Sequence, residues 1–244
     1  MTAGRATLAL AAVIASAMVA PLAAPLTAQP ASPNAPADAE VAALLDRTAT
    51  AYTGARTLRA AFTQTLTTSR AGAPLRSRGE FLQQGARRFA FRFTEPAEDR
   101  IIADGDGLWL YLPSTAKGQA IRMPRGAAAG AGLDLVGGLL TEPTRRYAVR
   151  AAADTLLEGR VLRRMTLTPR SGGAPFTTAT LWIDPTGPVI RRAILLEPTG
   201  FTRTLDFTQV RLNARLPRGA FTFIPPAGVR VIDQAALLGG VVPR

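Results

Sequence analysis

The chain contains no histidine and no cysteine, and Lys117 is its only lysine. The absence of histidine removes the usual general base at neutral pH and the Ser-His-Asp triad. The absence of cysteine removes thiol nucleophiles and disulfides, and the two absences together remove the common zinc ligand sets. Without cysteine the chain also lacks the lipid-modified residue that would tether an exported bacterial protein to a membrane.

Other catalytic motifs are absent as well. Gly130 and Gly132 lack the third glycine of a dinucleotide-binding loop, and no glycine-rich loop ends in Gly-Lys-Ser or Gly-Lys-Thr. The stretch 104–107 is too short for a calcium loop and favours a hairpin turn. Glu95 and Glu98 lie next to a proline, which favours a strand-end loop over a glycosidase carboxylate pair. We therefore expect a protein that is not an enzyme and that uses no metal and no cofactor.

The charge balance is strongly basic, with 29 Lys and Arg against 17 Asp and Glu, a net charge of +12. Such a balance is compatible with nucleic acid or anionic membranes as partners. Here the arginines are scattered through strand-like segments instead of forming one block, which favours solvated faces. We expect no nucleic-acid partner.

The first residues differ in composition from the rest of the chain. Arg5 precedes an apolar run over 6–20, followed by prolines and small residues, which is the order of a secretory signal. The run is too short to span a bilayer comfortably. We predict a signal peptide over 1–28 with cleavage near Ala28, a flexible mature N-terminus over 29–37, and a soluble protein in the periplasm.

A helical pattern follows, with Asp38 as its predicted N-cap and Gly54 as its end. Apolar side chains recur there at steps of three and four residues: Val41, Leu44, Leu45, Ala49 and Tyr52.

From Leu58 onward the pattern is almost entirely β. Short apolar alternations are separated by turn sequences such as Asp104-Gly105 and Asp184-Pro185-Thr186-Gly187. We predict about eleven strands, including a short final pair around 221–224 and 229–232. So many strands with almost no helix between them predict a mainly β fold, a single highly curved antiparallel sheet or open barrel.

One apolar segment interrupts the strands. A Gly- and Ala-rich hinge over 126–132 leads into a short helical pattern that stops at Pro143. Together with the first helix, this segment would cover an open face of the sheet as a lid, or it is a core helix packed permanently on that sheet, which the pattern alone favours. The candidate lid residues are Val41, Leu44, Leu45, Leu133, Leu135, Val136, Leu139 and Leu140.

Aromatic residues in the predicted strands raise a second pair of alternatives. Phe89, Phe91 and Phe93 occupy every second position, so an extended backbone places three rings on one face, with Arg88 and Arg92 on the other. Such a face is either the inside of an ordinary β-core or the wall of a cavity for an apolar ligand. The candidate cavity residues are Phe62, Phe81, Phe89, Phe91, Phe93, Trp109, Tyr111, Trp182, Phe221 and Phe223.

Four segments, in order and at similar spacing, resemble one known family. They are "LRAAFTQTL" with Phe62 and Gln64, "RGEFLQQGARRFAFRFTEP", "IIADGDGLWLYLP" and "AFTFIPPAGVRVIDQ". These segments are similar to the strand signatures of the periplasmic lipoprotein carrier family LolA, and the likeness extends over most of the mature chain.

The resemblance implies a LolA-like lipoprotein-binding domain over 38–234, followed by an unmatched tail over 235–244. It implies an incomplete antiparallel barrel with a helical lid over an apolar cavity for acyl chains. The implied partners are acylated lipoproteins, an inner-membrane ATP-driven releasing complex of the ABC type and an outer-membrane acceptor, with the carrier a monomer. The family's lid-contact arginine falls at Gly85-Ala86 here, and Arg87 or Arg88 is the candidate replacement.

Two other functions stay open. One is a lipoprotein-sensing regulatory module on the same fold. The other is a carrier of a different lipid, such as a glycolipid or sterol, which would differ in cavity volume and in no motif of this sequence.

Overall fold

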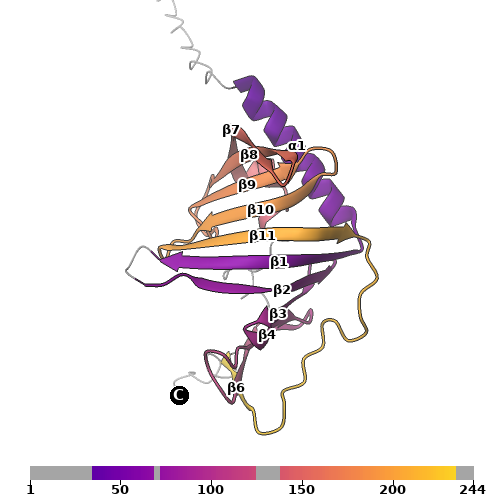
Figure 1. Ribbon diagram of the computed structural model, residues 1–244, viewed down its shortest axis with the longest axis vertical. Helices are drawn as coiled ribbons and strands as arrows, with labels where there is room; N and C mark the ends of the chain where they lie inside the picture. The colour runs from indigo at the N-terminus through magenta and orange to yellow at the C-terminus, as the bar shows by residue number, and fades with distance from the viewer. Residues whose placement is uncertain (1–34, 69–71, 125–137, 235–244) are drawn as a thin grey trace, which may run out of the picture. The chain divides into compact units, whose positions relative to one another are not determined.

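A computed structural model describes residues 35–68, 72–124 and 138–234. The predicted signal peptide, most of the predicted flexible N-terminus and the C-terminal tail therefore lie outside the described residues. The described chain is mainly β, with one long helix and one sheet (Figure 1). The helices are α1 (Ala35–Gly54) and α3 (Pro143–Arg146). The strands are β1 (Thr57–Thr68), β2 (Leu75–Gln84), β3 (Arg88–Glu95), β4 (Ala97–Ala103), β5 (Gly107–Tyr111), β6 (Gln119–Pro124), β7 (Tyr147–Leu157), β8 (Arg160–Pro169), β9 (Thr178–Asp184), β10 (Val189–Leu196), β11 (Phe201–Leu212) and β12 (Arg230–Asp233).

All twelve strands belong to a single unclosed sheet in the order β12-β6-β5-β4-β3-β2-β1-β11-β10-β9-β8-β7. Two meanders, β1–β6 and β7–β11, are joined where β1 pairs with β11, and every pair is antiparallel except β12 with β6. The predicted turns form: Asp184 Oδ1, for example, accepts hydrogen bonds from the Thr186 N–H (3.1 Å) and hydroxyl (2.6 Å). The predicted single, curved, mainly antiparallel sheet is confirmed.

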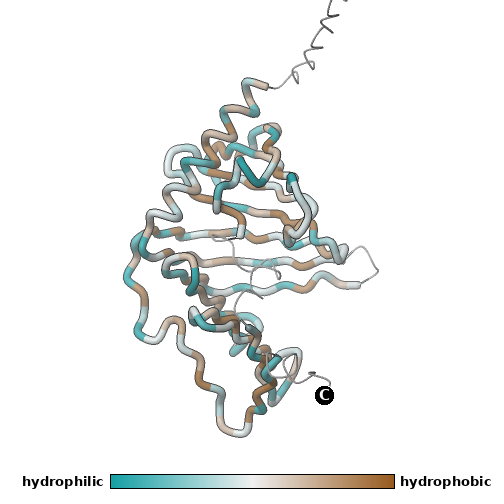
Figure 2. Tube along the Cα trace, turned by 180° about the vertical axis from the view of Figure 1, so that it is seen from behind, coloured by the Kyte–Doolittle hydropathy of each residue, from teal (hydrophilic) through white to brown (hydrophobic). Residues whose placement is uncertain are grey.

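Hydrophobic and hydrophilic residues alternate along the strands (Figure 2). Side chains of directly paired residues lie on the same face of a sheet, so the register assigns each residue to a face. We call the face that carries Phe62, Phe81 and Phe91 the inner face, because these three side chains belong to the main buried cluster. The opposite face, which carries Leu82, Ala90 and Ile102, is called the outer face.

Helix α1 packs against the β7 and β8 end of the sheet and against α3. Its buried side consists of Val41, Leu44, Leu45, Thr48, Ala49 and Tyr52. The helix ends at Gly54 as predicted, but the prediction of Asp38 as its N-cap is wrong, because the helix begins at Ala35. The Asp38 carboxylate instead accepts a hydrogen bond from the Ala151 N–H of β7 (2.7 Å) and pairs with Arg150. These contacts hold the helix on the sheet edge and lower the pKa of Asp38.

The outer face is crossed by an extended stretch, residues 213–229, which we call the outer segment. It follows β11 and leads to β12 at the far edge of the sheet. Arg92 of β3 donates to the carbonyls of Gly219 (3.2 Å) and Ala220 (3.0 Å), and Thr57 of β1 donates to that of Ala214 (2.6 Å). The prediction of a strand over 221–224 is therefore wrong, because this stretch packs Phe221 and Phe223 on the outer face instead of pairing its backbone with a strand.

Neither described helix has the length and hydropathy of a membrane-crossing segment.

The phenol of Tyr52 yields a prediction about alkaline stability. Burial raises the pKa of Tyr52 to about 12, although the Ile190 N–H, which donates to its oxygen (3.0 Å), partly opposes the rise. The unfolded chain ionises near its ordinary value of about 10, so stability present below pH 10 is lost as the pH rises to 12. We expect a loss of about 3 kcal/mol from this residue, measured by urea unfolding at stepped pH.

The variant Tyr52→Phe separates this titration from the hydrogen bond. At pH 7 it should lose about 1–2 kcal/mol, because the Ile190 N–H is left without its acceptor. Between pH 10 and 12 its stability should fall less steeply than that of the wild type. An equal slope in both proteins would contradict the assignment.

Candidate functional site

Five of the ten candidate cavity rings share the inner face. They come from three adjacent strands: Phe62 from β1, Phe81 from β2, and Phe89, Phe91 and Phe93 from β3. Their centroids lie close together, at 5.2 Å for Phe62–Phe91, 5.4 Å for Phe62–Phe93 and 4.7 Å for Phe81–Phe91. Each is at most 8% exposed. The period-2 spacing thus produces one continuous apolar layer, with its rings packed on one another.

Four other candidate rings lie on the outer face instead. In β5, Leu110 faces inward, so its neighbours Trp109 and Tyr111 must face outward. They contact the outer segment, with ring centroids 5.4 Å apart for Trp109–Phe223 and 5.3 Å for Tyr111–Phe223. Phe221 packs on the same outer cluster. These four rings therefore do not share a face with the phenylalanine layer.

Trp182 is the fifth ring of this kind. Its neighbours Leu181 and Ile183 are fully buried in the inner cluster, which directs Trp182 to the outer face. There its Nε1–H donates to the Thr155 hydroxyl (3.2 Å), and the Arg192 guanidinium lies 5.9 Å from its ring centroid. Trp182 therefore packs on the outer face of β8–β10.

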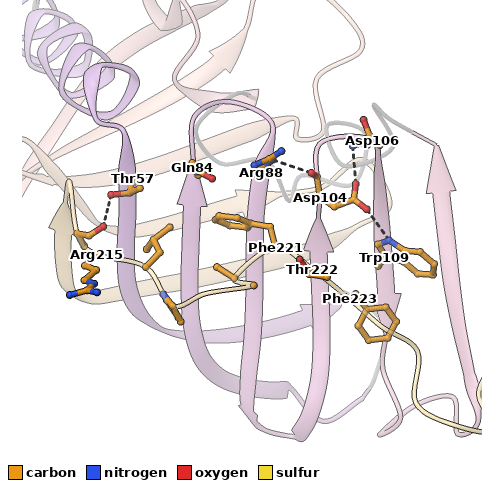
Figure 3. Close-up of a pocket in the computed structure, with 15 residues that line it drawn as sticks. Thr57, Gln84, Arg88, Asp104, Asp106, Trp109, Arg215, Phe221, Thr222 and Phe223 are labelled. Atoms are coloured by element: carbon orange, nitrogen blue, oxygen red, sulfur yellow. Dashed lines mark hydrogen bonds between the residues drawn. The ribbon is translucent and has the colours of Figure 1, made fainter.

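The outer segment and the strands beneath it enclose a cleft of about 730 Å³ (Figure 3). The Asp104 carboxylate at its edge accepts from the N–H groups of Asp106 and Gly107 (both 2.8 Å) and from the Trp109 ring N–H (3.1 Å). Burial alone would raise the pKa of Asp104, but these donors and Arg122 lower it below its ordinary value. The carboxylate therefore stabilises its own turn through these hydrogen bonds and stays ionised at neutral pH.

The arginine candidates do not reach the inner face. Arg88 pairs with Gln84 on the outer face, and its Nε donates to the Asp104 carbonyl (3.2 Å). Arg87 is exposed in the β2–β3 turn. A lid-contact role for either residue stays a prediction. Arg88 points to the outer face, whereas the lid residues lie on the inner face.

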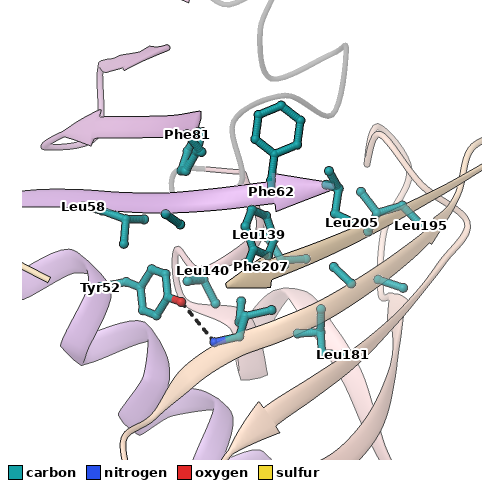
Figure 4. Packing of buried hydrophobic residues seen from close by; sticks show 14 of the residues in the cluster. Tyr52, Leu58, Phe62, Phe81, Leu139, Leu140, Leu181, Leu195, Leu205 and Phe207 are labelled. Carbon is teal, nitrogen blue, oxygen red and sulfur yellow. Dashed lines mark hydrogen bonds between the residues drawn. The ribbon is translucent and has the colours of Figure 1, made fainter. Parts of the chain in front are cut away.

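The candidate lid residues that the structure describes all point into the inner cluster. Val41, Leu44 and Leu45 of α1 are at most 3% exposed. Leu139 and Leu140, which precede α3, are equally buried. Figure 4 shows Leu139 and Leu140 among Tyr52, Phe62 and Phe207. The remaining three, Leu133, Leu135 and Val136, lie outside the described residues.

The inner face is closed at one end and open at the other. Along β1, Phe62 is 2% exposed, while Gln64 and Leu66 are half-buried. Leu75, the partner of Leu66, is 68% exposed, and Phe201, the partner of Thr68, is 37% exposed. We call this end, formed by β1, β2 and β11, the mouth of the inner face.

Four polar residues lie beside the mouth, and we call them the polar rung: Gln64, Ser77, Glu197 and Arg203. Only Gln64 was singled out from the sequence, as part of a signature. The others look like ordinary strand or turn residues until the pairing of β1 with β2 and β11, together with the turn from β10 into β11, brings them together. The only available signal was their place in alternation with inward-facing apolar residues.

Metal ligation has no candidate in the described ranges, where no three His, Cys, Asp or Glu side chains gather as a ligand set.

Comparison with known proteins identifies the family of this chain. Residues 53–224 match the model of the family described as outer membrane lipoprotein carrier protein LolA. The chain is 32% identical over 180 residues to an outer-membrane lipoprotein carrier protein of Methylibium petroleiphilum, covering 73% of this chain and 84% of that protein. It is 29% identical over 180 residues to a protein of the same name from Chromobacterium violaceum, covering 74% and 82%.

A solved structure supports the fold alone. An uncharacterized conserved protein from Thermus thermophilus superposes with a TM-score of 0.50 at 16% identity, covering 80% of this chain and 99% of that one.

The packing of the phenylalanine layer predicts a specific requirement for glycine. Gly79 pairs with Phe62 and Phe93, and a Cβ atom at residue 79 would lie 2.1 Å from the Arg92 carbonyl oxygen. Since the clash is with backbone, we expect Gly79→Ala to lower the free energy of unfolding by about 3 kcal/mol in urea titrations.

Gly54→Ala is the matched control, because its added Cβ would meet no atom within 4 Å. We expect it to change stability by less than about 0.5 kcal/mol. Equal effects of the two substitutions would contradict the close approach of β2 and β3.

Proposed function

This chain belongs to the LolA family of outer membrane lipoprotein carrier proteins, and from that premise we propose that it carries acylated lipoproteins from the inner to the outer membrane. The cargo's acyl chains bind against the inner face. The observation that carries this proposal is the layer of five phenylalanine rings, drawn from three adjacent strands and continuous with a mouth of exposed apolar residues.

The strength of apolar binding suits a carrier. Each methylene group moved out of water contributes about 0.8 kcal/mol. About ten methylene groups give roughly 8 kcal/mol, which corresponds to binding on the order of micromolar. Such an affinity holds cargo during transit and permits release to an acceptor.

Entry of acyl chains requires a covering element to move, and the polar contacts favour the segment 138–140 over α1. Helix α1 is fixed along its length, through Asp38 to β7, Glu40 to Arg163 (3.0 Å), Asp46 to Thr144 (3.0 Å) and Tyr52 to β10. Among the described residues, the side chains that donate to the segment 138–140 reach a single carbonyl. Gly138 O accepts from Arg146 (2.7 Å) and from the Tyr147 hydroxyl (3.0 Å).

The family supports the remaining parts of the proposal, except the signal peptide, which the composition of residues 1–28 supports. The protein works in the periplasm after removal of residues 1–28, receives cargo from an ATP-driven complex of the inner membrane and passes it to an acceptor at the outer membrane. It performs no chemical reaction. The net charge of +12 of the full chain comes almost entirely from arginines, and several of these pair with carboxylates, such as Arg59 with Glu80 (2.6 Å).

Native mass spectrometry tests the proposal directly. The protein is purified from the periplasm under native conditions, and one portion is measured intact to detect a bound acylated protein. A second portion is extracted with organic solvent to identify bound lipids. Recovery of an acylated lipoprotein in a one-to-one complex, on a chain that begins near residue 29, is the expected result. Free phospholipid or glycolipid would keep the cavity and change the cargo, and a stable protein partner without lipid would favour a sensor.

The variant Leu139→Asp tests the covering segment. Leu139 is 3% exposed in the inner cluster, so a carboxylate there should weaken binding of a diacylated lipopeptide at least tenfold. The control Leu156→Asp replaces a side chain that is 70% exposed and should leave binding unchanged. Affinity is measured by titration calorimetry, with thermal unfolding as the check on folding. Wild-type affinity in Leu139→Asp would mean that the segment 138–140 takes no part in binding, and if no lipid is recovered from the wild type either, the rings are a plain core.

A further inference from the structure

The polar rung lies on the inner face near its mouth, next to apolar side chains. Gln64 follows Phe62 on β1 and pairs with Ser77 of β2 and Leu205 of β11, which places its side chain on the inner face. Its Nε2 donates to the Ser77 hydroxyl oxygen at 3.3 Å, and its Oε1 accepts from Arg203 Nη1 at 3.0 Å. Three strands therefore contribute to one row of hydrogen bonds.

Arg203 links this row to a carboxylate. Its Nε and Nη2 lie 2.9 Å and 2.8 Å from the same oxygen, Glu197 Oε1. The side chains of Arg203 and Glu197 are only 14% and 18% exposed. Since removing charges from water is costly, a pair this sheltered at the edge of an apolar face calls for a reason beyond stability.

The rung still has hydrogen-bonding capacity. Among the contacts of the described residues, the Ser77 hydroxyl accepts a hydrogen bond and donates none, and the second N–H of Gln64 Nε2 has no acceptor. Glu197 Oε2 likewise accepts from no described group, because both Arg203 contacts go to Oε1. Two donors and one acceptor thus remain for a ligand at the place where the inner face opens.

The position of the rung defines which part of a ligand it meets. On its buried side lies the phenylalanine layer, and on its open side lie the exposed Leu75 and Phe201. A chain bound against the rings therefore leaves the apolar interior at the rung. A lipid changes there from hydrocarbon to the ester and amide groups that join its chains to the rest of the molecule.

We propose that the polar rung is the binding site for this carbonyl-rich linker of the cargo. The proposal rests on the carrier function above. Ser77 and Gln64 donate hydrogen bonds to ester or amide carbonyls, and Glu197 Oε2 accepts the amide N–H of the acylated cysteine. Arg203 is a positioning residue, which holds Gln64 Oε1 and Glu197 Oε1 so that their other groups point to the ligand.

The same carbonyl chemistry occurs in lipoproteins and in glycerophospholipids, so the test compares three probes. They are a synthetic N-palmitoyl-S-dipalmitoylglyceryl-cysteinyl peptide, its matched analogue in which ether-linked hexadecyl chains replace the two ester-linked chains, and dipalmitoyl phosphatidylglycerol. The ether analogue keeps the chains and the peptide but lacks the ester carbonyls. Affinities are measured by titration calorimetry on the full mature chain.

The variants are Ser77→Ala and Gln64→Leu, with Thr63→Ala as the control on the outer face of the same strand. We expect the wild type and the control to bind the ester peptide about tenfold more tightly than the ether peptide. Ser77→Ala should reduce that preference several-fold and leave the ether affinity unchanged. Gln64→Leu should also reduce the preference for the ester peptide. If Gln64→Leu does not fold, Ser77→Ala alone tests the proposal.

Each other result has one meaning. No ester preference in the wild type, or a preference that survives both variants, overturns the rung as a linker site. Equal losses for ester and ether probes make the rung structural and also overturn it. A Ser77-dependent preference for phosphatidylglycerol over the peptide keeps the rung and removes the lipoprotein cargo. If no probe binds, both the carrier function and the rung are wrong.

Discussion

The pairing of β1 with β11 is the contact on which the rest of the structure depends. It joins the meander β1–β6 to the meander β7–β11 and extends from Leu58 to Thr68. Because directly paired residues share a face, this register alone brings Phe62 opposite Phe207 and Gln64 opposite Leu205. Without it, the rings of β1–β3 and the aliphatic side chains of β8–β10 would form two separate surfaces.

A second constraint is that a sheet left unclosed has two large faces to cover. Helix α1 and the segment 138–140 cover part of the inner face, and the outer segment covers part of the outer face. The two coverings differ in kind. The outer segment is fixed by hydrogen bonds from Arg92 and Thr57. The carboxylate in its cleft, Asp104, already accepts hydrogen bonds from its own turn. The rings of the inner layer, in contrast, contact mainly other apolar groups.

This division assigns separate tasks to the two faces. Apolar contacts are non-directional, so under the proposed function the phenylalanine layer would accept hydrocarbon chains without selecting among them. Selection needs placed polar groups, and on the described inner face the polar rung lies where the chains would end. A carrier with this arrangement combines moderate affinity from the rings with recognition of the group that joins the chains to the cargo.

The sequence by itself determined the mainly β fold, the turns, the end of α1 at Gly54 and the common face of Phe89, Phe91 and Phe93, because these depend on local periodicity and turn chemistry. The sequence did not determine which face carries Trp109, because every residue of 108–112 is apolar or aromatic and no alternation of polar and apolar residues distinguishes the two faces there. It also could not show that residues 221–224 cross the outer face or that Arg203 meets Gln64. Only the tertiary structure decided these points, because strand register and the route of the outer segment depend on pairings between residues more than a hundred positions apart.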